Sequence, residues 1–333
     1  AEILTSIPAQ PPVLCHFGES TCRIGVKCVG CFLGLSLGSV CSWGAVTFNF
    51  NYLDVSGGTG IGFDDATQGS TYRGLLESVA NSYLGTLLDH TATVDITVNA
   101  SQTDGSGFLA SAGSSYFTVP NSFQPGLVGQ HIVTGVDPSL GNPDGSMTWD
   151  FGYTWGTGET VGGSEYDFRT VALHELTHAL GFASGISSSG ASVFGSNIYT
   201  YYDAFLVDGE GNALINEGTF VFQADAVDLT TQVGFAGAHA MAANGGEEVD
   251  VYTPATFASG SSLSHITAPN DVMLPSIGKG DSRRELTPRD IAILADMGYS
   301  FVANVPEAGS VAVCLGLGAL MFGVWRKGGK ANQ

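Results

Sequence analysis

The chain is poor in positively charged side chains. Lys and Arg number only 11 among 333 residues, against 31 Asp and Glu, which gives a formal net charge of -20. Nucleic acid is therefore excluded as an expected partner, because its phosphates attract basic surfaces. Charged residues of both signs make up only 13% of the chain, whereas glycine is abundant at 47 residues. Such a composition favours a loop-rich secreted protein over a cytosolic helical one.

Cysteine is absent from the long middle of the chain. The six cysteines lie near its two ends, at Cys15, Cys22, Cys28, Cys31, Cys41 and Cys314. The segment between Cys41 and Cys314 therefore has neither disulfides nor thiolate ligands. Any metal ion bound there must be held by His and carboxylate side chains.

The first 44 residues have the parts of a secretory signal peptide. Basic Arg23 and Lys27 precede an apolar, small-residue run from Cys28 to Val40, and the run is followed by Ser42-Trp43-Gly44-Ala45, in which three of the four residues are small. This order of a positive flank, an apolar run and a small-residue exit is typical of an export signal. The alternative is a buried helix of the fold, but the glycines of the run disfavour it. We expect residues 1–44 to be a leader and the protein to be exported.

The C-terminal tail reads as a separate module. Val305–Ala308 precedes an apolar run from Val311 to Trp325, and basic residues follow at Arg326, Lys327 and Lys330. This order resembles the bacterial PEP-CTERM sorting signal, although Ala308 stands where that signal has a second Pro. The resemblance implies removal of the tail by an exosortase-like membrane enzyme. The alternative is a C-terminal membrane anchor, a transmembrane helix with its basic end inside.

Between these ends, residues 45–303 are expected to form one domain, followed by the tail at 304–333. Val46–Leu53 and Thr93–Asn99 alternate apolar and polar residues as half-buried strands do, and Ser70–Asp89 between them has helical spacing. Two further alternating segments lie near Ser115–Val119 and at Met147–Trp155. The pattern predicts a mixed sheet backed by helices.

The segment Tyr166–Ser184 carries the chemistry. Its apolar residues recur at helical spacing, which predicts a buried helix ending at Gly181. His174 and His178 are four apart, with Glu175 between them. In such a His-Glu-x-x-His helix two neutral imidazoles hold Zn²⁺, and the carboxylate is free to act as a general base. The same spacing occurs by chance in other helices, but ionisable groups in so apolar a helix are costly to bury without a partner.

The motif by itself leaves the third metal ligand open. A thermolysin-like enzyme needs a Glu on a second helix, yet Gly185–Phe205 has no Glu and is too rich in Gly and Ser for that helix. The short metzincin pattern needs a His where Ser184 stands. His239 is one remaining candidate, although Met241 follows it too closely for a Met-turn. His90 and His131 are interpreted as ordinary surface histidines.

The run from His174 to Phe182 resembles the leishmanolysin-like branch of the metzincin zinc peptidases. In that branch an insertion separates the glycine from the third His, which precedes the methionine of the Met-turn. Here His265 precedes Met273 by eight residues. The resemblance implies that His174, His178 and His265 are zinc ligands, that Glu175 is the base, and that Met273 is the hydrophobic floor beneath the metal.

Two acidic features near the motif have open roles. Asp203 is a candidate to orient a ligand imidazole through its second nitrogen. Tyr201–Leu214 is expected to be a hairpin, with Asp208–Gly211 at its turn. This turn is interpreted as an ordinary solvated one, since the full spacing of calcium ligands is missing.

A terminal helix is predicted after Leu286, with Thr287 as N-cap, Pro288 in the first turn and Asp290 reaching back to the cap. The expected fold is thus α+β and metzincin-like. A twisted mixed sheet with backing helices and an active-site helix precedes a loop-rich C-terminal subdomain, which contains the Met-turn and this helix.

The function expected from these features is that of an exported or surface-attached zinc-dependent endopeptidase acting on protein or peptide substrates. Substrate would lie extended across the site helix and pair with a sheet edge. Two alternatives remain open. One is a surface binding protein with a structural or lapsed metal site, and the other is a metal-dependent hydrolase of a non-peptide bond.

Overall fold

The computed structural model describes residues 45–103, 107–223 and 228–302. The expected leader at 1–44 and the expected tail at 304–333 lie outside the described residues, so the predictions made on them stay predictions. Within the described residues, no helix has the length and apolarity needed to cross a membrane. The fold is mixed α+β, with several sheets and few helices.

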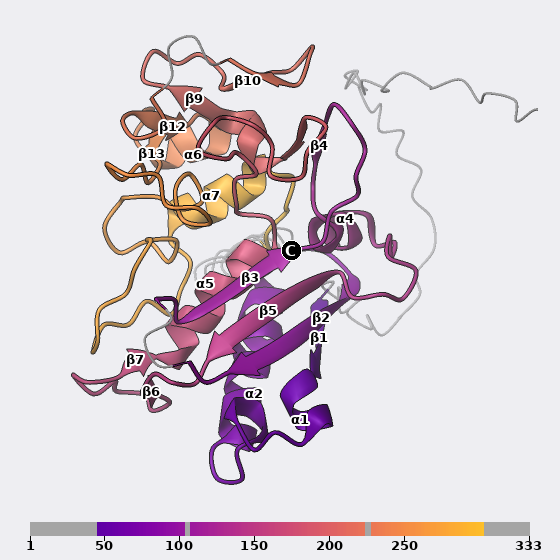
Figure 1. Ribbon diagram of the computed structural model, residues 1–333, viewed down its shortest axis with the longest axis vertical. Coiled ribbons are helices and arrows are strands. Elements are labelled where there is room, and N and C mark those ends of the chain that lie inside the picture. Colours follow the sequence, from indigo (N-terminus) through magenta and orange to yellow (C-terminus); the bar gives the residue numbers. More distant parts are fainter. Residues whose placement is uncertain (1–44, 104–106, 224–227, 303–333) are drawn as a thin grey trace, which may run out of the picture. The chain divides into compact units, whose positions relative to one another are not determined.

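The main sheet has the strand order β1-β2-β5-β3. Its first three strands are parallel, and the edge strand β3 runs antiparallel to β5. The bounds are β1 Val46–Tyr52, β2 Ala92–Ser101, β3 Ala110–Ser114 and β5 Gly145–Asp150. Figure 1 shows the four strands side by side, with α5 beside β3. The antiparallel edge strand thus borders the helix that carries the histidines.

One face of this sheet is apolar because its side chains alternate. In β2, Val94, Ile96 and Val98 are buried, whereas the residues between them are more exposed. Helices cover the buried face, as α/β layers require. The connection from β1 to β2 is the predicted βαβ unit. It contains α1 Leu53–Gly57, η1 Gly62–Asp64, α2 Gly69–Glu77, a π-helical η2 Ser78–Leu84 and α3 Gly85–Leu87.

The predicted helix over 70–89 is therefore present, but its middle widens into a π-helix. Asn81 lies in this part, where its Oδ1 accepts from the Phe48 amide at 2.7 Å and its Nδ2 donates to the Phe48 carbonyl at 3.2 Å. The side chain thereby occupies the outer edge of β1. Gly85 lets the helix pass close to the strand, because a Cβ there would lie 2.1 Å from the Val46 carbonyl oxygen.

Two strand predictions were wrong in position. The third strand is Ala110–Ser114 rather than Ser115–Val119. The chain leaves the sheet at Ser115, because the Ser115 carbonyl accepts from Leu127 and no longer faces β5. The predicted strand 147–155 ends at Asp150, whose carboxylate accepts from the Gly152 amide and turns the chain. Trp155–Gly156 then forms the separate short strand β6, paired with β7 Tyr166–Asp167.

The site helix α5 spans Phe168–Ala179. Asp167 is its N-cap and accepts from the Thr170 amide at 3.3 Å. Phe168 stacks on Trp149 of β5 with ring centroids 4.3 Å apart, which fixes this end against the sheet. The predicted stop at Gly181 is confirmed, since its φ of 99° is a conformation that glycine adopts at little cost.

The described part of the chain after α5 is rich in loops, and its sheets are small. Their strands are β8 Ile198–Thr200, β9 Leu206–Asp208, β10 Ile215–Asn216, β11 Val221–Phe222, β12 Val233–Phe235 and β13 Val249–Asp250, and β4 Ser122–Gln124, which precedes α5, pairs with β8. The helices outside the βαβ unit and α5 are α4 Leu127–Thr134, η3 Tyr202–Phe205, α6 Ala238–Ala243 and α7 Pro288–Asp296. The hairpin predicted from Tyr201 begins only at Leu206, because η3 occupies the residues before it.

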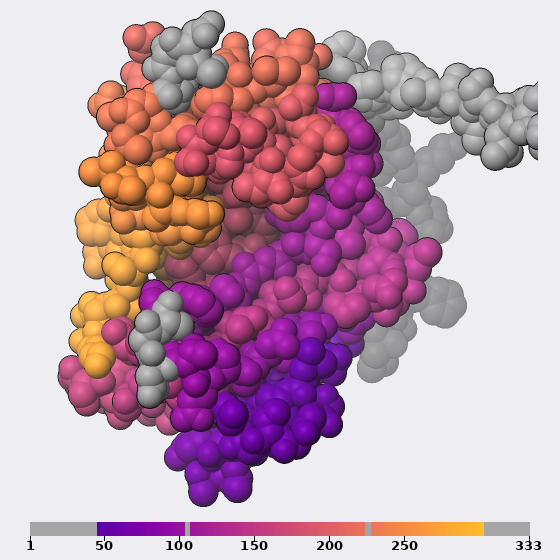
Figure 2. All heavy atoms as spheres, viewed as in Figure 1, coloured from indigo at the N-terminus to yellow at the C-terminus, as the bar shows by residue number. Residues whose placement is uncertain are grey.

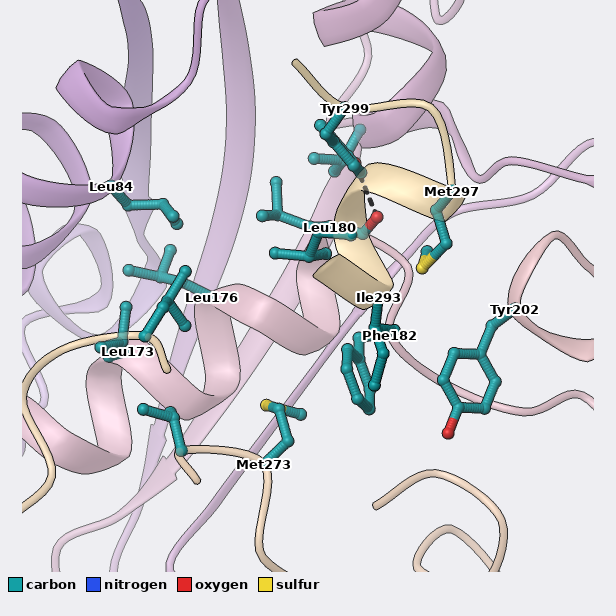
Figure 3. Packing of buried hydrophobic residues seen from close by; sticks show 14 of the residues in the cluster. Leu84, Leu173, Leu176, Leu180, Phe182, Tyr202, Met273, Ile293, Met297 and Tyr299 are labelled. Atoms are coloured by element: carbon teal, nitrogen blue, oxygen red, sulfur yellow. Dashed lines mark hydrogen bonds between the residues drawn. The ribbon is translucent and has the colours of Figure 1, made fainter. Parts of the chain in front are cut away.

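The predicted terminal helix is confirmed as α7, with the complete capping box between Thr287 and Asp290. Its apolar side packs on the C-terminal end of α5, where Ile293, Met297 and Tyr299 lie near Leu180 (Figure 3). The Tyr299 hydroxyl donates to the Leu180 carbonyl at 2.6 Å, the dashed line in Figure 3. The last helix thus anchors the end of the site helix.

Candidate metal centre

The three histidines singled out from the sequence converge at one point. The Nε2 atoms of His174 and His178 are 3.1 Å apart, and that of His265 lies 3.2 Å from His178 and 3.3 Å from His174. The first two stand one turn apart on α5, and the third comes from the loop after β13. These three side chains form a group that could hold a metal ion.

The proton positions of the three rings follow from their outer contacts. Each Nδ1 faces a backbone carbonyl, those of Val272 at 2.9 Å, Phe182 at 2.6 Å and Ser261 at 2.8 Å respectively. A carbonyl only accepts, so each Nδ1 carries the hydrogen and each neutral ring keeps a bare lone pair on Nε2. Three lone pairs then face one another with no proton to share, an arrangement that a cation at their centre stabilises.

The spacing also agrees with ligation. A tetrahedral ion with metal–nitrogen bonds of about 2.0–2.1 Å separates its ligand nitrogens by about 3.3 Å. The observed separations of 3.1, 3.2 and 3.3 Å are close to this value. The arrangement thus needs only small adjustments of the rings to accept an ion.

Burial keeps the imidazoles neutral, as metal ligation requires. The pKa of His174 is lowered to about 3, and burial is the largest cause. The charge of His265 has the next-largest lowering effect, and the Arg283 guanidinium has a smaller one. Burial likewise holds the pKa of His178 well below its usual range and lowers that of His265. The cluster is therefore ready to bind a cation at neutral pH without first losing protons.

Glu175 lies between α5 and the edge strand β3. It is 4% exposed, and burial raises its pKa to about 8, against a smaller opposing effect of a hydrogen bond from the Ala112 backbone. Its Oε2 is buried and has no hydrogen-bond partner within the described part of the chain. Glu175 directly follows His174 on α5, and its free Oε2 can accept a proton once the carboxyl group is ionised.

No family model, curated protein or solved structure matches this chain. What the centre can do follows from its donor set, which is three imidazole nitrogens, a buried carboxylate beside them and no thiolate, since residues 42–313 contain no cysteine. Three imidazole nitrogens of this kind could hold a divalent metal ion.

The turn around Met273 holds two of the three histidines through its backbone. The Val272 carbonyl accepts from His174, and the Met273 carbonyl accepts at 3.0 Å from the amide of Ile266, the residue after His265. The Met273 side chain is fully buried in the apolar cluster beside α5 (Figure 3). The sequence pointed to the methionine, but it held no signal for the two carbonyls.

Asp203 does not orient an imidazole, so that suggestion was wrong. Its Oδ1 accepts from the Ser184 hydroxyl at 2.6 Å, and its Oδ2 accepts from the amides of Gly185 and Thr200, both at 2.9 Å. The carboxylate thereby fixes the loop that follows Gly181. Ser184 in turn donates its amide to Ser264, next to His265, at 3.0 Å.

The other histidines of the described residues lie outside the cluster. His239 is exposed on α6, where its amide donates to Asp296, and His90 accepts from the Ser300 amide. His131 is buried, not a surface residue as expected, and its Nδ1 bonds Asp144 at 3.0 Å.

Two acidic features outside the cluster are occupied by local hydrogen bonds. His131, Asp144 and Asp137 lie close enough to share an ion. Asp137, however, already accepts from Ser139 and Gly141, in keeping with an ordinary loop. The turn after Asp208 is held in the same way, because that carboxylate accepts the amides of Glu210 and Asn212.

Proposed function

We propose that this protein is a zinc-dependent endopeptidase of the metzincin type, with His174, His178 and His265 as the zinc ligands. The observation that carries the proposal is the convergence of three Nε2 lone pairs within 3.3 Å of one another, each ring fixed by a carbonyl on its far side. Second contacts of this kind orient histidine ligands and raise their basicity. Three imidazoles with a fourth position open are typical of catalytic rather than structural zinc.

A zinc ion held there supplies Lewis-acid polarisation of a carbonyl and lowers the pKa of a water molecule toward neutrality. Glu175 has the free Oε2 that can take the water proton and pass it to the leaving amine. A site that only stabilises the fold has no use for such a carboxylate, and its burial without a full set of partners is costly. Glu175 therefore favours catalysis over a structural metal.

The edge strand β3 suits an extended peptide. No described strand pairs with its outer side, and the backbone of Ala112 in its middle bonds Glu175. Figure 2 shows a hollow between this purple edge and the red and orange segments that follow α5. A peptide that adds to β3 through main-chain hydrogen bonds thus passes Glu175.

Three features agree with the leishmanolysin-like resemblance. Gly181 adopts a positive φ, Met273 is buried beside α5, and a capped helix follows the turn.

We further propose that the protein is exported by its leader and sorted or anchored through its tail. Mass analysis of the mature protein from culture tests this, and an untrimmed chain in the cytoplasm would contradict it.

Hydrolysis of casein by the zinc-loaded protein tests the function. We expect activity that a chelator abolishes and zinc restores, and a loss of about 10²- to 10⁴-fold in Glu175→Gln, the usual contribution of a general base. Glu217→Gln, an exposed carboxylate, serves as the matched control. If the protein binds zinc with the same affinity in wild type and Glu175→Gln but does not cleave casein, the peptidase proposal is wrong. A binding protein or a hydrolase of another bond would then be favoured.

A further inference from the structure

We infer that Arg283 recognises an acidic group on the substrate, on the C-terminal side of the bond to be cut. The inference rests on the proposed peptidase function and names a substrate class for it. Arg283 lies ten residues beyond Met273, and no sequence motif pointed to it.

Arg283 borders the metal centre on one side. Its amide donates to the Thr170 hydroxyl at 2.7 Å, and its Nη2 donates to the Ser276 carbonyl at 2.8 Å. Thr170 is four residues before His174, so it stands one turn earlier on the same face of α5. The positive charge is also close enough to act on the His174 imidazole.

Cations are few in the described residues, and most of them are occupied. They are Arg73, Arg169, Lys279, Arg283, Arg284 and Arg289. The last two, with Arg169, form ion pairs with carboxylates. Lys279 lies over the Tyr166 ring, and Arg73 donates to the Phe63 carbonyl.

Arg283 differs because it combines a place beside the centre with an unused donor. No described carboxylate lies within ion-pair distance of it, and its Nε is buried without a hydrogen-bond partner. A guanidinium that has no carboxylate partner gains from one, because hydrogen bonds between charged groups are the strong ones. The chain has a net charge of -20, so its surface as a whole repels acidic substrates. The unpaired charge of Arg283 attracts them at this one place.

The direction of the substrate follows from the packing of β3 on α5. Ala110 at the start of β3 pairs with Trp149, which stacks on Phe168 at the start of α5. At the other end, Ser114 bonds the amide of Val128, and a Cβ on Gly181 would lie 3.3 Å from the carbonyl of Pro125, just before that helix. Strand and helix therefore run in the same direction (Figure 1).

A peptide that pairs antiparallel with β3 then runs in the direction opposite to that of both β3 and α5. Antiparallel pairing is the slightly more stable kind and is already used between β3 and β5. Such a peptide places its N-terminal part near Gly181 and its C-terminal part near the first turn of α5. Arg283, anchored on Thr170, meets the residues that follow the cut bond.

The test uses two fluorogenic peptides that are identical except for Glu or Gln directly after the cleavage site. We expect the zinc-loaded protein to cut the Glu peptide with a kcat/KM about tenfold or more above that of the Gln peptide, since hydrogen bonds between charged groups are the strong ones. Arg283→Gln should abolish the preference while leaving cleavage of the Gln peptide, and Arg283→Lys should keep part of it. The matched control is Lys279→Gln, an exposed cation of the same segment, which should leave the preference intact.

Binding separates this inference from the proposed function. Two peptides carry a metal-chelating hydroxamate at their amino end, followed by Glu in one and Gln in the other, and their affinity for the zinc-loaded protein is measured directly. Tighter binding of the Glu form, lost in Arg283→Gln, supports recognition even if no peptide is ever cut. Equal affinities, or an equal loss in Lys279→Gln, would overturn the role of Arg283.

Discussion

At the scale of single residues, the centre is prepared by groups that are not ligands. The carbonyls of Val272, Phe182 and Ser261 fix the hydrogen of each imidazole on Nδ1 and turn each Nε2 inward. The rings therefore hold the form that binds a cation before any cation arrives. This pre-organisation lowers the cost of binding, because no ring has to reorient or deprotonate.

The same burial makes the metal-free protein sensitive to acid through these rings. The folded-state pKa of His178 lies far below the usual 6.5, so its contribution to stability is fully present above pH 6.5 and is lost as the pH falls toward the folded value. We compare the free energies of unfolding of wild type and His178→Gln, both freed of metal by a chelator. We expect the amount by which wild type exceeds the variant to shrink by about 1 kcal/mol per pH unit below about pH 6.

Urea unfolding of both proteins at pH 7.5, 6.0 and 5.0 measures this advantage. The two proteins must be compared because Glu175 makes the stability depend on pH in the opposite direction. Its pKa is raised, so its contribution to the free energy of unfolding is fully present below pH 4.5 and is lost as the pH rises through about 8. His239→Ala is the control for an exposed imidazole. A constant difference between wild type and His178→Gln across this range would show that the ring is not buried in its neutral form.

At the scale of elements, the start of α7 serves both the helix and the metal centre. Asp290 completes the capping box with Thr287, and the same Oδ2 accepts from the Val272 amide at 3.1 Å. Next to it, Arg289 pairs with Asp271 at 2.9 Å. The helix end thus holds the two residues before Met273, and with them the carbonyl that orients His174.

Two substitutions separate these roles. Thr287→Ala removes only the cap, so we expect a loss of about 1 kcal/mol in the free energy of unfolding and little change in zinc affinity. Asp290→Ala also frees the Val272 amide, so it should lower zinc affinity by about 10- to 100-fold, the usual effect of losing a group that supports a ligand. Denaturant unfolding and competition with a chromophoric chelator measure the two quantities. Equal zinc affinities of the two variants would refute the coupling.

At the scale of the whole described fold, the centre joins parts of the chain that lie far apart in sequence. His174 and His178 belong to the helix that backs the main sheet, whereas His265 belongs to the loop-rich part after it. The contacts of Asp203, Ser184 and Ser264 lie within the loop-rich part, where they join the segment that follows α5 to the loop of His265. An ion in the centre therefore cross-links the fold in addition to any chemistry.

Removal of metal should accordingly destabilise the whole domain. An ion that binds only the folded state at 1,000 times its Kd contributes about 4 kcal/mol, so we expect a chelator to lower the Tm by several degrees. His265→Ala should show a low Tm that zinc no longer raises, whereas His239→Ala should respond as wild type does. Calorimetry with and without zinc checks this, and an unchanged Tm in wild type would argue against a bound ion.

Much of the fold could be predicted from local pattern. Alternation identified β1, β2 and the later part of β5, helical spacing identified α2 and α5, and capping chemistry identified α7. The errors at Ser115–Val119 and after Asp150 share one cause. Alternation says that a segment can be a strand, but hydrogen bonds to groups outside the sheet, such as those from Leu127 to Ser115 and from Gly152 to Asp150, decide where pairing ends.

By itself, the sequence determined which side chains could form a metal site, because two imidazoles four residues apart on an apolar helix have few other stable uses. Only the tertiary structure decided that His265 rather than His239 joins them, that three carbonyls set their protons, and that an unpaired arginine lies beside them. Those facts depend on backbone groups and on contacts between residues up to 113 positions apart, as from Arg283 to Thr170, for which a linear sequence carries no local signal.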